Sequence, residues 1–360
     1  MSSFEPSPDQ ELRPVADAKP AAAAKSPSKG PRLSGPEHDD VRARIERGEI
    51  ASGRGVRWIG VDLSGLDLSG WDLEGAELSR SKLVGTRLIG AKLLGATLFE
   101  ADLTDADFSN ADLTEANMEG ARALRTAFGA AKLVRTRLGL ADLTGASWVG
   151  VNAEGASLTG ACLERARLGQ ANLKGADLTR CSLREAELSS VQVFGTTFAG
   201  ADLRGAKLPG ISGFRKADWL GVDLRDVDFS GAYLCRNVIL DQNYLEDFRT
   251  SSKFNAVVYQ LWKATSDCGR SALRWAVCTG VATVLFAILY AFVGVDFGEN
   301  ATPLSPLYFS VVTITTLGYG DVLPVTQTAQ MVVMAQVMVG YIMLGGLISL
   351  CASKMATRAA

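Results

Sequence analysis

The chain has 360 residues, long enough for two folded units, and its 37 basic and 39 acidic residues leave a formal net charge of −2. This near balance gives no reason to expect a nucleic acid or a strongly charged partner. The six cysteines form no Cys-x-x-Cys pair and there is one histidine, which disfavours a disulfide framework, a zinc site and a histidine-based hydrolase. With no catalytic constellation in view, we expect neither an enzyme nor a bound cofactor.

The first residues differ in composition from the rest of the chain. Residues 1–38 are rich in Pro, Ala, Ser and Lys and hold almost no large apolar side chains. Because such a segment cannot bury enough surface to offset its ordering entropy, it is predicted to be a disordered tail. Asp39 and Asp40 then precede a helix-like stretch that ends at Gly48, which predicts a short capping helix within residues 39–55.

Residues 56–240 repeat with a period of five. A large apolar residue returns at nearly every fifth position from Leu63 to Leu208, and the residue two places before it is usually Ala. The series slips by one residue near 211–214 and resumes at Phe214, Trp219, Leu224, Phe229 and Leu234. A fixed period of this kind indicates a repeat architecture, and the slip predicts a local bulge.

The spacing sets the geometry of each repeat. In an extended chain, residues two apart share a face, so the Ala and the following Leu both point inward. The next Ala would face outward unless the chain turned a corner, and regular corners wind the chain into stacked coils. Ala123 and Ala153 stand where the series expects a large residue, which predicts local distortion of the coil. A helix is disfavoured because a period of five keeps no stripe on it.

The five-residue pattern, visible in segments such as ADLTD, ANLKG and ADLRG, resembles the pentapeptide-repeat family. The resemblance implies a right-handed quadrilateral β-helix with four repeats in each coil. Some members of that family mimic DNA through an acidic surface, but acidic and basic residues nearly balance over residues 51–240. We therefore expect no nucleic acid as a partner.

Residues 241–270 leave the repeat and change to helical spacing. Apolar residues recur at this spacing with two lysines alongside: Phe254, Val257, Val258, Leu261, Trp262, Lys253 and Lys263. The pattern predicts an amphipathic linker helix. Two placements stay open for it, one in the lipid headgroup layer and one against the end of the β-helix.

Two uncharged apolar stretches near the C-terminus are each long enough to cross a bilayer. They predict an outer transmembrane helix within residues 271–295 and an inner one within 326–353, followed by a short cytosolic tail at 354–360. Basic residues lie outside this pair of spans and acidic residues lie between them, so the positive-inside rule places both termini in the cytosol. We expect a multi-pass protein of the cell membrane, in contact with lipid.

Residues 296–325 lie between the spans and hold a short apolar segment followed by the run TTLGYGD at residues 315–321. The segment is too polar at its end for a third span and predicts a re-entrant pore helix and loop. The run resembles the selectivity filter of potassium channels, with Leu317 where Val is commonest. The resemblance implies a potassium-selective channel, and because one chain supplies only one wall of the pore, it implies a homotetramer.

A filter that strips water from K⁺ needs successive carbonyl oxygens aimed the same way. Gly318 and Gly320 permit the unusual dihedral angles that this requires. The resemblance implies that the carbonyls of Thr316, Leu317, Gly318 and Tyr319, together with the Thr316 hydroxyl, bind the permeant K⁺ ions. Tyr319 is expected to point away from the ions and brace the filter from behind.

Neighbouring residues receive roles from the same resemblance. Asp321 would concentrate cations at the outer mouth, and Thr313 and Thr315 would belong to the pore helix. Gly340 stands 19 residues after Asp321, where two-span channels commonly carry a hinge glycine; a close-packing glycine is the alternative. Val312 stands where some relatives carry an acid that pairs with the filter aspartate.

No arginine-rich helix precedes the pore segment, so a conventional voltage sensor is not expected. The leading hypothesis is passive K⁺ permeation through a channel whose cytosolic repeat domain serves regulation, docking or assembly. Its regulator would be a cytosolic protein or a small molecule. The alternative is a membrane-tethered pentapeptide-repeat scaffold whose pore unit mainly oligomerises it.

Overall fold

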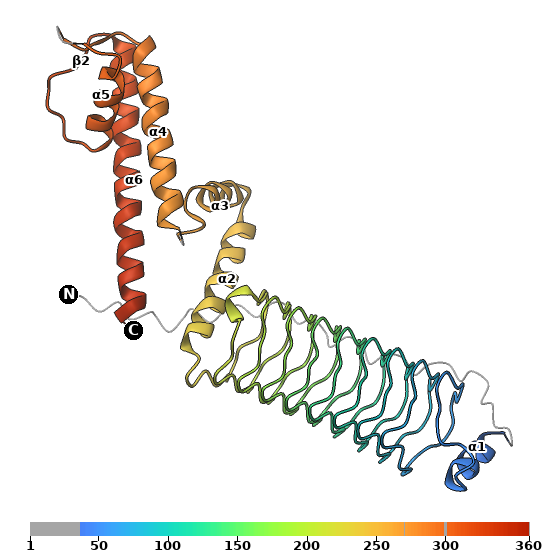
Figure 1. The fold of residues 1–360 in the computed structure, drawn as a ribbon. Helices are drawn as coiled ribbons and strands as arrows, with labels where there is room; N and C mark the ends of the chain where they lie inside the picture. The colour runs from blue at the N-terminus through green and yellow to red at the C-terminus, as the bar shows by residue number, and fades with distance from the viewer. Residues whose placement is uncertain (1–36, 270, 299–300, 360) are drawn as a thin grey trace. The chain divides into compact units, whose positions relative to one another are not determined.

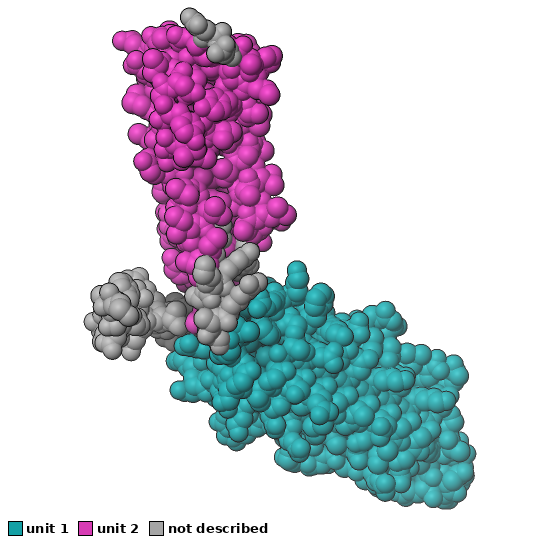
Figure 2. All heavy atoms as spheres, turned by 60° about the vertical axis from the view of Figure 1, so that its left-hand side comes forward, with its two compact units in different colours: residues 1–238 teal, residues 239–360 magenta. Residues whose placement is uncertain are grey.

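A computed structural model of the protein describes residues 37–269, 271–298 and 301–359. The chain forms two compact units, residues 1–238 and residues 239–360, which have different colours in Figure 2. The tail expected at 1–38 lies outside the described residues, except for its last two positions. Those two positions already belong to a helix.

That helix is α1, Glu37–Glu46, the first described element (Figure 1). Arg42 Nη1 donates a hydrogen bond to the Ser64 carbonyl at 2.9 Å. Ile45, on the same helix, is buried. The helix is therefore tied to the first part of the repeat that follows it.

The repeat itself consists of coils of backbone stacked one on the next (Figure 1). Parallel bridges join each bridged residue to the one 20 positions later, from Arg57 with Glu77 to Gln192 with Ser212. Each coil therefore holds four five-residue repeats, and each repeat has one bridged position and one two-residue turn. This is the β-helix predicted from the period of five.

Both inward positions of the repeat are buried. Every fifth residue from Leu63 to Leu208 is fully buried, and most of the small residues two places earlier are buried with it. Where Thr takes the small position, its hydroxyl donates to a carbonyl of the preceding coil, as Thr86 does to Leu63 at 2.9 Å. The interior is therefore a continuous apolar column in which these inward hydroxyls are satisfied.

Inside the column, large aromatic side chains lie beside small alanine side chains of neighbouring repeats. Phe108, Phe128 and Trp148 lie in successive coils, with ring centroids 5.4 and 5.6 Å apart. Ala123 comes one repeat before Phe128, and Ala153 one repeat after Trp148, so each small residue leaves room beside an aromatic ring. The backbone ladder is unbroken at both alanines, with N–H···O distances of 2.7 and 2.8 Å. The distortion predicted at these positions is therefore wrong.

The turns of the β-helix have left-handed backbone at the last residue of the repeat, which is often glycine. Several turns have charged residues instead, and these pair across neighbouring coils. Arg80 and Glu100, at φ 58 and 54, form an ion pair of 2.8 Å. Asp105 and Arg125 pair in the same way at 2.6 Å. Most of the charged residues at these turns thus meet an opposite charge one coil away.

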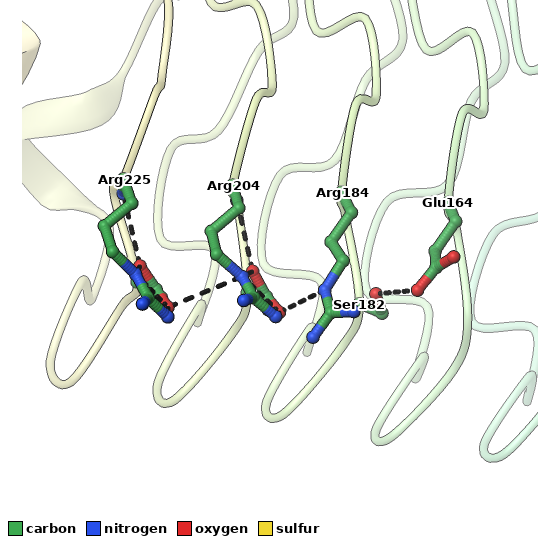
Figure 3. A network of polar contacts seen from close by, with 7 residues as sticks. Glu164, Ser182, Arg184, Arg204 and Arg225 are labelled. Carbon is green, nitrogen blue, oxygen red and sulfur yellow. Dashed lines mark hydrogen bonds and ion pairs between the residues drawn. The ribbon is translucent and has the colours of Figure 1, made fainter. Parts of the chain in front are cut away.

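A longer network of polar contacts runs along one side of the β-helix (Figure 3). Arginines of three successive coils alternate with two aspartates, and a serine–glutamate pair lies beside them: Arg184, Asp202, Arg204, Asp223, Arg225, Ser182 and Glu164. The contacts between arginine and aspartate range from 2.5 to 3.6 Å. The row neutralises its own charge and presents no surplus of either sign.

One extra residue near position 213 changes the register. Bridges up to Gln192–Ser212 span 20 residues, and from Thr197–Asp218 onward they span 21. Gly213 has φ 78, and a short 3₁₀ helix, η1 (Phe214–Lys216), follows it. A Cβ atom at Gly213 would lie 2.7 Å from the Phe194 amide nitrogen, so only glycine fits. The predicted bulge is present.

The repeat ends earlier than residue 240. Helix α2, Tyr233–Ser251, begins where Leu234 was expected to continue the series, so that part of the prediction is wrong. Leu234 keeps the period of five by coincidence, because a helix also accepts an apolar residue there. The first turn of α2 buries Cys235, whose burial raises the pKa of the thiol to about 12.

The linker forms two helices rather than one. α2 ends at Ser251, and α3 spans Lys253–Ser266. Between them Ser252 is extended, and its hydroxyl accepts a hydrogen bond from the Asn255 amide at 3.0 Å. This serine caps the start of α3, so the single linker helix predicted over 241–270 is wrong in its bounds.

After α3, the described residues of unit 2 form three helices and one small strand pair. Its elements are α4 (Ala272–Phe292), β1 (Val295–Asp296), α5 (Ser305–Ile314), β2 (Leu323–Pro324) and α6 (Gln327–Ala359). β1 and β2 pair antiparallel, and α4, α5 and α6 pack against one another. Tyr290, Phe309 and Val322 form the buried centre of this bundle.

Among the described residues, two helices are long and apolar enough to cross a membrane, Ala272–Phe292 and Gln327–Ser349. α6 continues as helix to Ala359, through the stretch expected as a short tail at 354–360. Residues 350–359 are mostly good helix formers and contain neither Gly nor Pro, so nothing in the sequence ends the helix at residue 353.

Candidate functional site

Helix α5 holds the start of the TTLGYGD loop, which is residues 315–321. Pro306 lies in the first turn of α5, where a missing backbone donor costs nothing. Phe309, Val312 and Thr313 are buried, so one face of the C-terminal half of the helix packs inside the bundle. Thr315 ends the helix, and its hydroxyl donates to the Val311 carbonyl at 2.7 Å.

The backbone of the TTLGYGD loop alternates in handedness. Thr316, Gly318 and Gly320 have φ of 58, 57 and 79, and no positive φ is recorded for Leu317 or Tyr319. An ordinary strand points successive carbonyls in opposite directions, whereas alternating left-handed residues bring them to the same side. The loop therefore departs from an ordinary strand at every second residue from Thr316 to Gly320.

Sequence reasoning anticipated this geometry at the two glycines but missed Thr316. A β-branched residue with positive φ is a rare outlier and stores strain. Two hydrogen bonds hold it, from the Thr316 amide to the Thr313 carbonyl at 3.1 Å and from the Leu317 amide to the Val312 carbonyl at 3.0 Å. Counting back in steps of two from Gly320 would have found it.

The side chains of the loop are exposed in a single chain. Leu317 is 59% exposed and Tyr319 is 66% exposed. Tyr319 was expected to brace the loop from behind, and within the described residues of one chain its side chain stays largely open. Thr316 is exposed as well, and its hydroxyl donates to the Thr315 carbonyl at 2.7 Å.

The far end of the loop is tied back to α5. The Tyr308 hydroxyl donates to Asp321 Oδ2 at 2.8 Å. Val312, one turn further along the helix, is buried and offers no polar group. Sequence reasoning compared only position 312 with the aspartate and so missed Tyr308. The signal was the helical spacing, because residues four apart share a face of the helix.

α6 passes close behind the start of the loop at Gly340. A Cβ atom at this position would lie 2.5 Å from the Ile314 carbonyl oxygen, and α6 is continuous through it. Gly346 makes a similar approach to the Trp275 ring at 2.2 Å, whereas Gly345 has nothing within 4 Å. The structure shows close packing at Gly340, and its role as a hinge stays a prediction.

Comparison with protein families gives two matches that do not overlap. Residues 277–357 match the family described as Ion channel. Pentapeptide repeats match in several overlapping segments between residues 59 and 198. No curated protein sequence matches the chain.

Solved structures similar to the chain include two pentapeptide repeat proteins. One is HetL, involved in heterocyst differentiation regulation, from the cyanobacterium Nostoc sp. strain PCC 7120, with 25% identity over 54% of this chain and 94% of that one, at a TM-score of 0.26. The other comes from the Arabidopsis thaliana thylakoid lumen, with 27% identity over 37% of this chain and 71% of that one, at a TM-score of 0.19. From the two family matches, the protein joins a pentapeptide-repeat domain to an ion-channel domain in a single chain.

Proposed function

We propose that the protein is a potassium-selective channel in which α5 and the TTLGYGD loop form the re-entrant pore segment. The observation that supports this most is the alternation of left-handed backbone at Thr316, Gly318 and Gly320. The loop lies between two helices of membrane-spanning length, within the segment that matches an ion-channel family. Filters of this kind bind K⁺ through backbone carbonyls that replace its water.

In this proposal the carbonyls of Thr316, Leu317, Gly318 and Tyr319, with the Thr316 hydroxyl, bind K⁺ in transit. Gly320 completes the turn of the backbone toward the outer mouth. There Asp321, held by Tyr308, adds one carboxylate per subunit and raises the local cation concentration.

The exposure of the loop supports the homotetramer in this proposal. One loop surrounds no ion, and its side chains lie open in the single chain. α6 also leaves a row of large apolar residues exposed: Met331, Met334, Met338, Tyr341, Ile342 and Ile348. Four copies around one axis would cover part of this surface, and lipid would cover the remainder. Both termini would face the cytosol of a cell membrane.

The β-helix is assigned to regulation, docking or assembly on the cytosolic side, in its right-handed quadrilateral form. Its candidate regulators are a cytosolic protein or a small molecule. α3 would lie in the lipid headgroup layer, because Phe254, Val257 and Leu261 on it are 75, 59 and 62% exposed. Only five residues separate α3 from α4, which keeps it near the end of the first span.

The test is cation flux through the purified protein in liposomes, with K⁺ compared with Na⁺. The unmodified protein is expected to pass K⁺ selectively. Gly318→Ala is expected to abolish that flux, because alanine is strained at φ 57. Gly345→Ala makes the same chemical change where nothing lies within 4 Å, and it should leave the flux intact.

Absence of K⁺ flux from a stably assembled protein, under conditions that open related pores, would contradict the proposal. That result would favour a membrane-tethered scaffold. Equal flux of K⁺ and Na⁺ would retain the channel and reject potassium selectivity.

A further inference from the structure

Gln336 is a polar residue buried in the middle of an otherwise apolar helix. It lies in α6, within the stretch Gln327–Ser349 that is long and apolar enough to span a membrane, and it has no exposed surface. A buried polar group at membrane depth is costly unless it is hydrogen bonded. Gln336 is not among the residues proposed to bind K⁺ or to line the outer mouth.

All the hydrogen-bonding groups of the Gln336 side chain have partners on other helices. Its Nε2 donates to the Ser310 carbonyl at 3.0 Å and to the Ser310 hydroxyl at 2.7 Å. Its Oε1 accepts from the Tyr290 hydroxyl at 2.5 Å. The Ser310 hydroxyl in turn donates to the Thr283 carbonyl at 2.7 Å. The network therefore joins α6 to α5 and to α4, with no group of the amide left over.

A second contact one helical turn away fixes the same pair of helices. Gly340 follows Gln336 by four residues, and Ile314 follows Ser310 by four residues. α5 and α6 therefore touch at two points one turn apart, Gln336 with Ser310 and Gly340 with the Ile314 carbonyl. The contact at Gly340 depends on the absence of a side chain, whereas the contact at Gln336 is a set of directed hydrogen bonds. Together they set both the rotation and the axial position of α5 on α6.

The TTLGYGD loop leaves α5 directly after Ile314. Its first residues are hydrogen bonded to Val312 and Thr313, which lie in the turn after Ser310. Any rotation of α5 would therefore carry the start of the loop with it. Apolar packing alone tolerates such a rotation, whereas hydrogen bonds of fixed direction resist it.

We propose that Gln336 is a positioning residue that locks α5, and through it the TTLGYGD loop, in one register on α6. Its effect on ion selectivity rests on the proposed channel function, but its effect on the order of the loop does not. Tyr290 on α4 and Ser310 on α5 are the hydrogen-bonding partners through which Gln336 acts.

The first experiment measures backbone hydrogen exchange by mass spectrometry on the full-length protein in detergent or nanodiscs. Gln336→Leu is expected to speed exchange of the amides of residues 310–321 roughly tenfold, while the β-helix is unchanged. Gln330→Leu is the matched control, because it makes the same change on the same helix at an exposed side chain. Equal exchange in the two variants, or faster exchange spread evenly over α4, α5 and α6, overturns the proposal.

Two smaller changes guard against misfolding of Gln336→Leu. Tyr290→Phe and Ser310→Ala each remove one hydroxyl from the network and should raise exchange in the same residues. Combining Tyr290→Phe with Gln336→Leu should add little, since both act on one network. Fully additive effects would show that the residues act separately and would overturn the lock.

The second readout is the K⁺ to Na⁺ permeability ratio in liposomes. Gln336→Leu is expected to lower that ratio several-fold, whereas Gln330→Leu keeps it. If the unmodified protein passes no K⁺, the channel proposal fails and the exchange comparison still decides the role of Gln336. If it passes K⁺ selectively and Gln336→Leu has the same ratio, the positioning of the loop by Gln336 is rejected.

Discussion

Left-handed backbone occurs in both units, and the residues that accept it differ. In the β-helix it recurs at the last position of the repeat, where glycine needs no compensation and charged residues pair across coils. In the TTLGYGD loop it falls on Thr316, whose branched side chain has no such compensation. The strain at Thr316 is instead held by the hydrogen bonds to the end of α5.

Leu140 is a turn residue whose side chain neither suits a left-handed backbone nor is buried. It has φ 58 and is 74% exposed, so it bears the cost of the left-handed form and gains little from burial. Leu140→Gly is expected to raise the free energy of unfolding by up to about 1 kcal/mol, because relief of strain exceeds the extra freedom of the unfolded chain. Urea unfolding of a fragment of residues 37–251 would measure it.

Leu138→Ala in the same fragment provides the contrast. Leu138 is fully buried in the column, and its truncation should lower the free energy of unfolding by about 2–5 kcal/mol. If Leu140→Gly destabilised the fragment to a similar extent, the turn leucine would have a packing role that its exposure does not reveal.

At this scale the sequence predicted what a period or a motif marks, and it missed what depends on contacts. The inward residues of the repeat and the two loop glycines followed from spacing. Gln336 did not, because an isolated polar residue among apolar ones has no pattern. Tyr308 was missed because only position 312, one turn further along the same face of α5, was compared with the aspartate. The partner of Tyr308 lies 13 residues away in the chain, and the partners of Gln336 lie 26 and 46 residues away, so only the packed bundle brings them together.

The packing of α6 can be tested by substitution at two of its glycines, Gly340 and Gly345. Gly340→Ala places a methyl group 2.5 Å from a backbone carbonyl that cannot move without α5, so α6 must shift away. Gly345→Ala meets open space and gains helix propensity. We expect Gly340→Ala to lower the thermal stability of the full-length protein by several degrees, and Gly345→Ala to leave it equal or higher.

The same pair of variants separates packing from hinge. A pure hinge would tolerate alanine in stability measurements and change only how often the pore opens. Unchanged melting temperature for Gly340→Ala, together with altered flux, would therefore reject the packing account.

Element boundaries were less accessible to sequence reasoning than element types. The end of the β-helix was placed too late because Leu234 keeps the period inside a helix. The break at Ser252 was missed because a capping serine resembles any surface serine until its acceptor role is seen. The length of α6 was underestimated because the prediction followed the apolar stretch that can cross a membrane. The helix continues past that stretch, since the residues after it also favour helix.

Over the whole molecule, the two units differ in how acid should affect them. In the β-helix, hydrogen bonds from Ser69 to Asp67 and from Ser230 to Asp228 hold the pKa of each carboxyl below its ordinary value. The Arg125 guanidinium does the same for Asp105. The two apolar helices, residues 272–292 and 327–349, contain no carboxylate.

A carboxyl with a lowered native pKa stabilises the fold above its ordinary pKa, and this contribution is lost as the pH falls below about 4. We expect the β-helix to lose stability below about pH 4 while the two apolar helices, α4 and the span within α6, persist. Circular dichroism during an acid titration would show loss of the β signal with the helical signal retained. Asp105→Asn should make the loss smaller, and simultaneous loss of both signals would contradict the expectation.

The four repeats in each coil also govern how a chain of this kind can change its length. An insertion or deletion of 20 residues adds or removes one whole coil, so the chain still leaves the β-helix from the same side. A change of five residues keeps every inward face but moves the exit a quarter of the way around the coil. Insertions or deletions of one whole coil therefore leave the direction of the following segment unchanged, whereas insertions or deletions of fewer repeats change it.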